Sequence, residues 1–102
     1  MPRTSKDRLT ATQVRALKFE GRPYKRSDGQ NLFLRVESGG KYWHLRYYWG
    51  KNDRGRPKEK MLSLGVYPDV SLAEARTKRD AVRKLLAHGI DPSADRKARN
   101  AS

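Results

Sequence analysis

Cationic, aromatic and hydrogen-bonding side chains alternate with apolar ones in the stretch from Lys41 to Trp49. Successive side chains of a β-strand point to opposite faces, so an extended stretch sorts these residues into two sets. One face carries Tyr42, His44, Arg46 and Tyr48. The other carries Trp43, Leu45, Tyr47 and Trp49. The first set offers groups that hydrogen-bond to anions and stack on flat rings, and the second is mostly a surface to bury.

The runs on either side of this stretch show the same two-residue alternation. Leu32 to Glu37 precedes it and Lys60 to Leu64 follows it. Alternation bounded by turn residues is typical of half-buried antiparallel strands, so we predict a three-stranded meander with the aromatic stretch at its centre. The predicted core face carries Leu32, Leu34, Val36, Trp43, Leu45, Tyr47, Leu62 and Leu64. The predicted open face carries Phe33, Arg35, His44, Arg46, Tyr48, Met61 and Ser63.

Two capping-box patterns predict helices around this sheet. Thr10 with Gln13 opens a short first helix, and Ser71 with Glu74 opens the longest one. The apolar stripe of the long helix is expected at Leu72, Ala75, Arg79, Val82, Leu85 and Leu86. Within it, the stem of Arg79 packs and its head group reaches water. The bases of this helix are interpreted as its solvated face: Arg76, Lys78, Arg79, Arg83 and Lys84.

The expected fold class is therefore α+β: a three-stranded antiparallel sheet packed on one face by a long C-terminal helix, with a short N-terminal helix. Residues 1–8 are expected to form a basic arm, residues 9–92 the domain, and residues 93–102 the start of a linker or of a further helix. Lys25 and Arg26 suggest a short edge segment before a turn at Asp28-Gly29. Residues 50–58 are predicted to be a long, flexible connection.

Composition points to an anionic partner. The 102 residues suggest one small domain, and 24 Lys and Arg against 11 Asp and Glu give a formal net charge of +13. The sequence contains no cysteine, no apolar run long enough to span a bilayer and no apolar signal-peptide core. We therefore expect a cytoplasmic protein with no membrane partner and no cofactor.

The residue types do not assemble a catalytic or metal site. The two histidines, His44 and His88, belong to different predicted elements, and no cysteines or paired carboxylates join them at metal-ligand spacing. Near Ser63 and Tyr48 the sequence supplies neither a base nor an orienting group for a nucleophile. We expect no enzymatic activity from this chain alone.

The open face and the loop beside it are instead suited to duplex DNA. A B-form major groove admits a β-ribbon, in which arginines form bidentate hydrogen bonds to guanine and apolar side chains meet thymine methyls. The candidate base-contacting residues are Arg35, His44, Arg46, Tyr48, Met61 and Ser63, and Phe33 is a further candidate for thymine methyl contact. The candidate phosphate-contacting residues are Lys41, Lys51, Arg54, Arg56, Lys58 and Lys60.

Each assignment has a plainer alternative. Phe33 and Tyr48 also fit cross-strand packing that only stabilises the sheet. His44 also fits an ordinary surface histidine, and the connection at residues 50–58, with one acid among four bases, also fits a solvated loop. These alternatives stay open at the level of sequence.

Several ordered motifs resemble one known family. They are Tyr24-Lys25-Arg26-Ser27-Asp28-Gly29, Leu32-Phe33-Leu34-Arg35-Val36, Gly39-Gly40-Lys41-Tyr42-Trp43, Leu62-Ser63-Leu64-Gly65-Val66-Tyr67-Pro68, Ser71-Leu72-Ala73-Glu74-Ala75-Arg76 and Leu85-Leu86-Ala87-His88-Gly89-Ile90-Asp91-Pro92. Together they resemble the N-terminal arm-type DNA-binding domain of prophage and genomic-island tyrosine integrases over residues 9–97.

The resemblance implies a three-stranded sheet backed by a helix that binds arm-type sites flanking an attachment site. It also implies that strand exchange belongs to a separate C-terminal domain, with a core-binding domain between, and that oligomers form mostly through those other parts on DNA. The chain would then bind DNA in the bacterial cytoplasm, at the nucleoid, without cutting it.

Two rival functions fit the same composition. Small basic sheet-and-helix folds also bind double-stranded RNA or the ribosome, and such a module would prefer an A-form duplex. A protein-binding scaffold whose charge serves solubility would bind its partner without dependence on salt.

Overall fold

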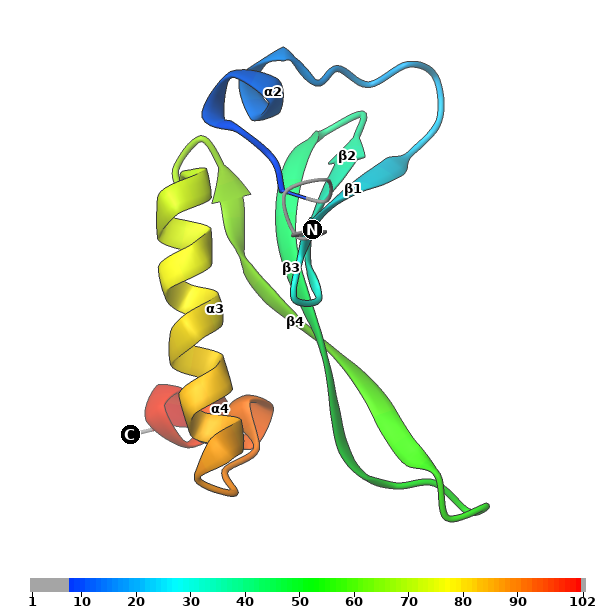
Figure 1. The fold of residues 1–102 in the computed structure, drawn as a ribbon, viewed down its shortest axis with the longest axis vertical. Helices are drawn as coiled ribbons and strands as arrows, with labels where there is room; N and C mark the ends of the chain where they lie inside the picture. The colour runs from blue at the N-terminus through cyan, green and yellow to red at the C-terminus, as the bar shows by residue number, and fades with distance from the viewer. Residues whose placement is uncertain (1–7, 102) are drawn as a thin grey trace, which may run out of the picture.

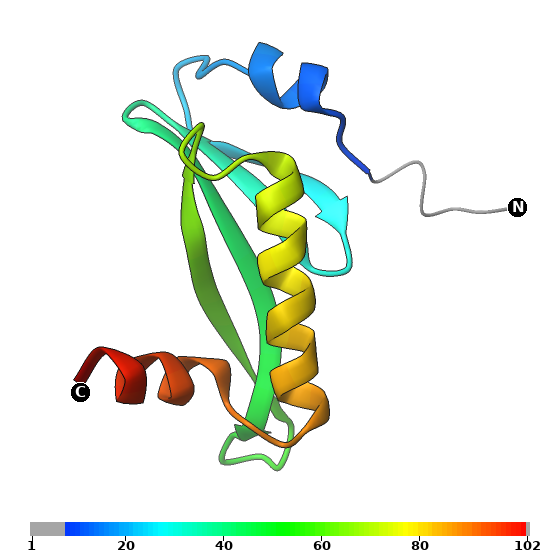
Figure 2. The same ribbon diagram turned by 90° about the vertical axis from the view of Figure 1, so that its left-hand side faces the viewer.

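The computed structural model describes residues 8–101, and the basic arm predicted at residues 1–8 lies outside the described residues except for Arg8. A four-stranded antiparallel sheet forms the body of the protein, with the strand order β1-β2-β3-β4. Helix α3 lies along one face of the sheet, α2 lies near one end and α4 near the other (Figures 1 and 2). In chain order the elements are α2 (Ala11–Ala16), β1 (Tyr24–Gly29), β2 (Leu32–Glu37), β3 (Gly40–Lys51), β4 (Pro57–Tyr67), α3 (Leu72–Ala87) and α4 (Pro92–Ala101).

The prediction of three strands was one strand short. The residues expected to be a short edge segment form β1, which pairs with β2 so that Lys25 opposes Arg35 and Ser27 opposes Phe33. The turn predicted at Asp28-Gly29 lies two residues further along the chain, at Gln30 and Asn31, which have φ angles of 54° and 68°. An edge strand with few apolar side chains on either face leaves no alternating signal in the sequence.

The hairpin of β3 and β4 extends well beyond the rest of the sheet (Figure 1). Its strands continue to Lys51 and resume at Pro57, so the connection is shorter than the loop predicted for residues 50–58. Asn52 organises the turn, because its Oδ1 accepts hydrogen bonds from the backbone amides of Arg54 and Arg56 at 2.8 and 3.1 Å. The cationic loop is therefore carried on the end of a two-stranded arm.

The core lies between α3 and one face of the sheet. The predicted core-face residues Leu32, Leu34, Val36, Trp43, Leu45, Tyr47, Leu62 and Leu64 are all buried. They pack with Leu72, Ala75 and Val82 of α3. Each fully buried large apolar side chain contributes roughly 1.5–3 kcal/mol. Trp43 also donates its indole N–H to the carbonyl oxygen of Val70 at 2.8 Å, which fixes the β4–α3 connection against the sheet.

Both predicted capping boxes are present, at Thr10 with Gln13 and at Ser71 with Glu74. The solvated-face interpretation of α3 is wrong for two of its arginines. Arg76 donates two hydrogen bonds to the carboxylate of Asp28, at 2.9 and 2.7 Å, and one to the carbonyl of Leu9. Arg79 is only 6% exposed and lies 3.7 Å from the same carboxylate, which is itself buried. A buried carboxylate requires cationic partners, so the two arginines turn inward.

Residues predicted as a linker or a further helix form α4, whose first residue is Pro92. Asp91 holds this helix against the sheet. Its Oδ1 accepts hydrogen bonds from the hydroxyl of Tyr47 and the amide of Ser93, and its Oδ2 accepts one from Lys60 at 2.9 Å. Burial raises the pKa of Asp91, but the hydrogen bonds from Lys60, Tyr47 and Ser93 outweigh it, so that the pKa lies below its ordinary value.

Candidate nucleic-acid interface

The sheet face opposite α3 brings the six predicted base-contacting residues together. Strand pairing places His44 between Phe33 and Ser63, places Arg46 opposite Met61, and places Arg35 opposite Tyr42. Because facing residues of paired strands share a side of the sheet, these positions form one surface. The six residues on this surface are Arg35, His44, Arg46, Tyr48, Met61 and Ser63.

Phe33 lies at the centre of this open face but is only 6% exposed. The His44 ring packs on it at a centroid distance of 5.7 Å. The ammonium of Lys25 and the guanidinium of Arg46 lie 5.1 and 5.8 Å from the ring centre. The cross-strand packing alternative therefore fits Phe33, which forms an aromatic floor beneath cationic groups.

Arg46 and Arg35 differ in how their guanidinium groups are engaged. The Nε of Arg46 lies 3.5 Å from a Glu59 carboxylate oxygen, within ion-pair range, but makes no hydrogen bond to the described residues. Arg35 forms an ion pair with its neighbour Glu37 and is substantially exposed. Exposed ion pairs of this kind are worth roughly 0–1 kcal/mol, so DNA phosphates or base edges can replace these carboxylates at small cost.

His44 is partly buried between the aromatic floor and the arginines. Burial, together with the positive charge of Arg35, lowers the pKa of His44 below its ordinary value of 6.5. The ring is therefore neutral at pH 7, with one nitrogen as a donor and the other as an acceptor. A neutral imidazole of this kind can contact either a donor or an acceptor on a base edge.

Two large side chains on the open face are exposed. Tyr48 is 50% exposed and Met61 is 46% exposed, and both lie where β3 and β4 leave the body of the sheet. Their exposure favours contact with a ligand over the packing alternative for Tyr48.

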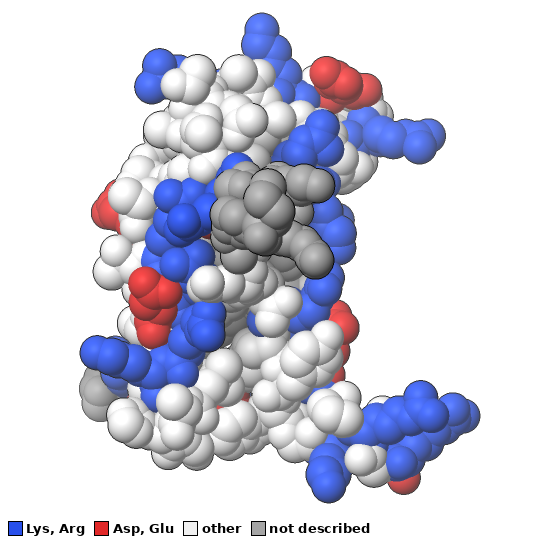
Figure 3. Space-filling model, viewed as in Figure 1, with Lys and Arg blue, Asp and Glu red and all other residues white. Residues whose placement is uncertain are grey.

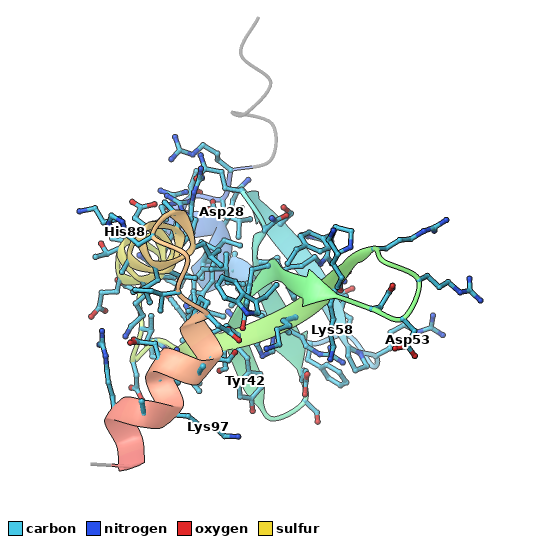
Figure 4. The ribbon with its side chains drawn as sticks, turned by 90° about the horizontal axis from the view of Figure 1, so that it is seen from below. Asp28, Tyr42, Asp53, Lys58, His88 and Lys97 are labelled. Atoms are coloured by element: carbon cyan, nitrogen blue, oxygen red, sulfur yellow. The ribbon has the colours of Figure 1, made fainter. Side chains whose placement is uncertain are left out.

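The end of the hairpin carries the cations predicted to contact phosphate. Lys51, Arg54, Arg56 and Lys58 are all exposed there. Figure 3 shows them as a projecting cluster of Lys and Arg side chains, with further cations along α3. Seen from below, Asp53 and Lys58 mark the projecting hairpin on the side of the molecule away from α3 and His88 (Figure 4). This cluster lies at the end of the same two strands that carry the open face.

The other two predicted phosphate contacts, Lys41 and Lys60, lie on the core side of their strands. Lys41 shares its side of β3 with Trp43 and donates to the carbonyl oxygens of Val14 and Arg15 at 2.7 and 3.3 Å, and burial lowers its pKa. Lys60 donates to Asp91, and this hydrogen bond raises its pKa. Both ammonium groups tie helices to the sheet.

Besides Glu37, which pairs with Arg35, three polar residues of the open face were not predicted there. Lys25 and Ser27 of β1 oppose Arg35 and Phe33, and Glu59 opposes Tyr48. The sequence could have placed Glu59 on this face, since Glu59, Met61 and Ser63 are two residues apart along the chain. Lys25 and Ser27 could be placed only once β1 was recognised as a strand.

Within residues 8–101 no group of three or more His, Cys, Asp or Glu side chains is arranged to hold a metal ion. Among the helices of this described part, none is both long and apolar enough to cross a membrane. Apart from Lys41 and Lys60, the predicted site residues lie on the open face and at the hairpin end.

Comparison with known proteins agrees with the resemblance seen in the sequence. The family described as "Arm DNA-binding domain" matches residues 9–99. The integrase of Enterobacteria phage P4 is 44% identical over 91 residues, which cover 88% of this chain and 20% of that protein. Prophage integrase IntS of Escherichia coli K12 is 45% identical over 91 residues, covering 88% and 22%.

Putative protein IntB of the same organism is 52% identical over 60 residues, which cover 59% of this chain and 14% of that protein. The chain thus spans about a fifth of the length of the phage P4 and IntS integrases. Because the family profile covers most of the chain, the chain belongs to the Arm DNA-binding domain family.

Proposed function

We propose that this chain binds double-stranded DNA in a sequence-specific manner, at arm-type sites that flank an attachment site. It would do so as the N-terminal domain of a tyrosine recombinase that integrates or excises a mobile element. Family membership and the names of the related integrases support this proposal. The observation that carries the site assignment is the convergence of Arg35, His44, Arg46 and Ser63 on one open sheet face.

In the proposed complex the open face enters the major groove. The groove is about 12 Å wide, and three neighbouring strands about 4.8 Å apart span roughly 10 Å, so β2, β3 and β4 present Arg35, Arg46 and Ser63 to it together. The two guanidinium groups would form bidentate hydrogen bonds to guanine O6 and N7, while Ser63 and His44 contact other base edges. Tyr48 and Met61 would meet thymine methyl groups.

The hairpin end supplies affinity without sequence information. Lys51, Arg54, Arg56 and Lys58 would contact phosphates and release counterions, so that binding weakens as salt rises. Lys41 and Lys60 are not assigned as phosphate contacts, because their ammonium groups hydrogen-bond to α2 and to Asp91. Strand exchange would be carried out by a separate catalytic domain of the complete integrase, and this chain alone would not cleave DNA.

The test is fluorescence anisotropy of the chain against three duplexes at several salt concentrations: DNA from the attachment-site flanks, a shuffled DNA of equal composition, and RNA of the matching sequence. We expect tightest binding to the flanking DNA, with a preference that persists at moderate salt. Preference for the RNA duplex would support the RNA-binding alternative, because only a surface fitted to A-form geometry favours it. Equal binding to all three would contradict sequence-specific recognition.

A further inference from the structure

A hollow on the open face opens at the β1–β2 turn. It is lined by Lys25 and Ser27 of β1, by Gln30 and Asn31 of the turn, and by Phe33 and Arg46 of the neighbouring strands, with backbone from Gly29 and Leu32 completing it. None of these described lining residues is acidic. The hollow is separate from the hairpin end, and none of the predicted site residues lies on β1.

The donors around the hollow suit one oxyanion. Lys25 brings an ammonium group, and Arg46, whose Nε pairs with Glu59 at 3.5 Å, adds its guanidinium to the lining of the hollow. The Ser27 hydroxyl accepts a hydrogen bond from the Gly29 amide at 3.1 Å, which leaves its own proton available to donate. Two cations and a hydroxyl around one hollow match the charge and the acceptor oxygens of a phosphate.

The surrounding structure holds these donors in place. The Phe33 ring lies beneath both cations and is itself buried, so the groups are fixed over an apolar floor. The turn is secured from two sides: the Arg46 amide donates to the Asn31 carbonyl at 2.9 Å, and Arg83 of α3 donates to the Gln30 side chain at 2.6 Å. The hollow is therefore formed before a ligand arrives.

Sheet dimensions identify the phosphate as one from the DNA backbone. Neighbouring strands are about 4.8 Å apart, so β1 and β4 of the four-stranded sheet lie roughly 14 Å apart. A major groove is about 12 Å wide, so when the base-contacting strands β2, β3 and β4, which span roughly 10 Å, lie within it, β1 reaches the phosphates at one rim. The Lys25 side of β1 then faces one rim.

We propose that this hollow binds a backbone phosphate at the edge of the major groove, with Lys25 as its main cation and β1 as part of the DNA-contacting surface. The inference rests on the proposed function and adds a phosphate site to it. Arg46 then has two roles, since it lines the hollow and also projects toward the groove.

Lys25 and Arg26 provide a matched pair for the test. Both are exposed, both belong to β1 and both carry one positive charge, but they lie on opposite faces, and Arg26 packs over the Tyr24 ring instead. Binding of each variant to one mixed-sequence duplex is measured by anisotropy across a series of salt concentrations. We expect K25Q to reduce the slope of log K against log salt by about 0.9, and R26Q to leave it unchanged. K25R should keep the wild-type slope.

Equal slopes for K25Q and R26Q would overturn the inference, because they would reduce Lys25 to a contributor of net charge. The backbone amide signals of Ser27 and Gly29 provide a second readout. They should shift when duplex DNA is added to the wild type, shift much less in K25Q, and stay in place with inorganic phosphate alone. A shift with inorganic phosphate as large as that with DNA would assign the hollow to a free anion and overturn the backbone assignment.

The two proposals fail separately. If the wild type shows no preference for flanking DNA while K25Q still reduces the slope of log K against log salt, sequence-specific recognition is wrong and the phosphate site stands. If the preference is present while K25Q and R26Q behave alike, only the phosphate site is wrong.

Discussion

The two faces of β3 differ sharply although their residues alternate along one strand. Trp43, Leu45 and Tyr47 face α3 and have 0–2% of their surface exposed, whereas Tyr48 on the other face is half exposed. The buried set closes the core and its removal costs folding free energy. The open set is not needed for burial, so its cations and hydrogen-bonding groups are free to serve a ligand.

Three residues cross this division. Phe33 belongs to the open face but is buried under Lys25, His44 and Arg46, while Lys41 and Lys60 belong to the core side but bear charges. Each exception joins two parts of the molecule: Phe33 supports the cations, and the two lysines attach α2 and α4 to the sheet. The position of a residue on a strand therefore predicts its face, while its role depends on what packs there.

The largest effect is expected from Trp43→Ala on the core face. Removing this buried side chain and its hydrogen bond to Val70 should lower the free energy of unfolding by about 3–5 kcal/mol. The matched change on the open face, Tyr48→Ala, should alter it by less than about 0.5 kcal/mol. Urea denaturation followed by circular dichroism measures both. Comparable losses would show that the two faces do not divide stability from binding.

A similar loss is expected from Asp28→Asn, at about 3 kcal/mol, because the change removes the buried negative charge that pairs with both Arg76 and Arg79. Asp80→Asn is the control. Its carboxylate pairs with the same arginine but is 65% exposed, so its removal should cost less than about 0.5 kcal/mol. Equal midpoints for the two variants in a urea titration would contradict the buried cluster as a source of stability.

On the open face, Arg46→Gln should cost about 1–3 kcal/mol of discrimination between the flanking duplex and a shuffled one. Folding should change little, since Arg46 makes only a partly exposed ion pair and a contact with the Phe33 ring. Lys84→Gln on α3 removes the same charge from the other side of the molecule and should leave the discrimination intact. If both variants lost affinity equally on every sequence, the assignment of Arg46 as a base-contacting residue would be wrong.

At the hairpin end, Lys51→Gln should weaken binding to all duplexes alike and reduce the salt slope by about 0.9. The reason is that a phosphate contact carries no base information. Anisotropy with specific and shuffled DNA across a salt series measures the slope. A loss confined to the specific duplex would move Lys51 into the group of base-reading residues.

The smallest effect concerns pH. In the free protein the pKa of His44 lies below 6.5, and nearby phosphates in a complex would raise it again. Binding would then take up a proton, so affinity should increase as pH falls from about 7 through the free-protein pKa. His44→Gln should remove this increase in affinity at lower pH. A wild-type affinity that falls over the same range would place His44 away from the DNA.

Sequence patterns predicted strands β2, β3 and β4 because alternation and turn residues are local signals. Both capping boxes were found for the same reason, since their partners are three residues apart. β1 was expected only as a short edge segment and not counted as a strand, because its side chains are mostly exposed and give no alternating pattern. Helix α4, with its charged sequence, is held by Tyr47 and Lys60, which are distant in the chain.

The candidate site divides in a similar way. The alternation of side chains along the strands was enough to place Arg35, His44 and Arg46 on one face. The inward turn of Arg76 and Arg79 depends on Asp28, 48 residues from Arg76 in the chain, so no local pattern encodes it. The engagement of Lys41 with α2 likewise requires knowledge of where α2 lies.

The most direct test of the account is an NMR titration of the chain with flanking duplex DNA, observing the side-chain Nε–H signals of Arg35 and Arg46 together with those of Arg83 on α3. Large shifts are expected for Arg35 and Arg46, and little change for Arg83. Shifts concentrated on Arg83 and the rest of α3, with the open-face signals unmoved, would contradict the assignment of the open sheet face as the DNA-binding surface.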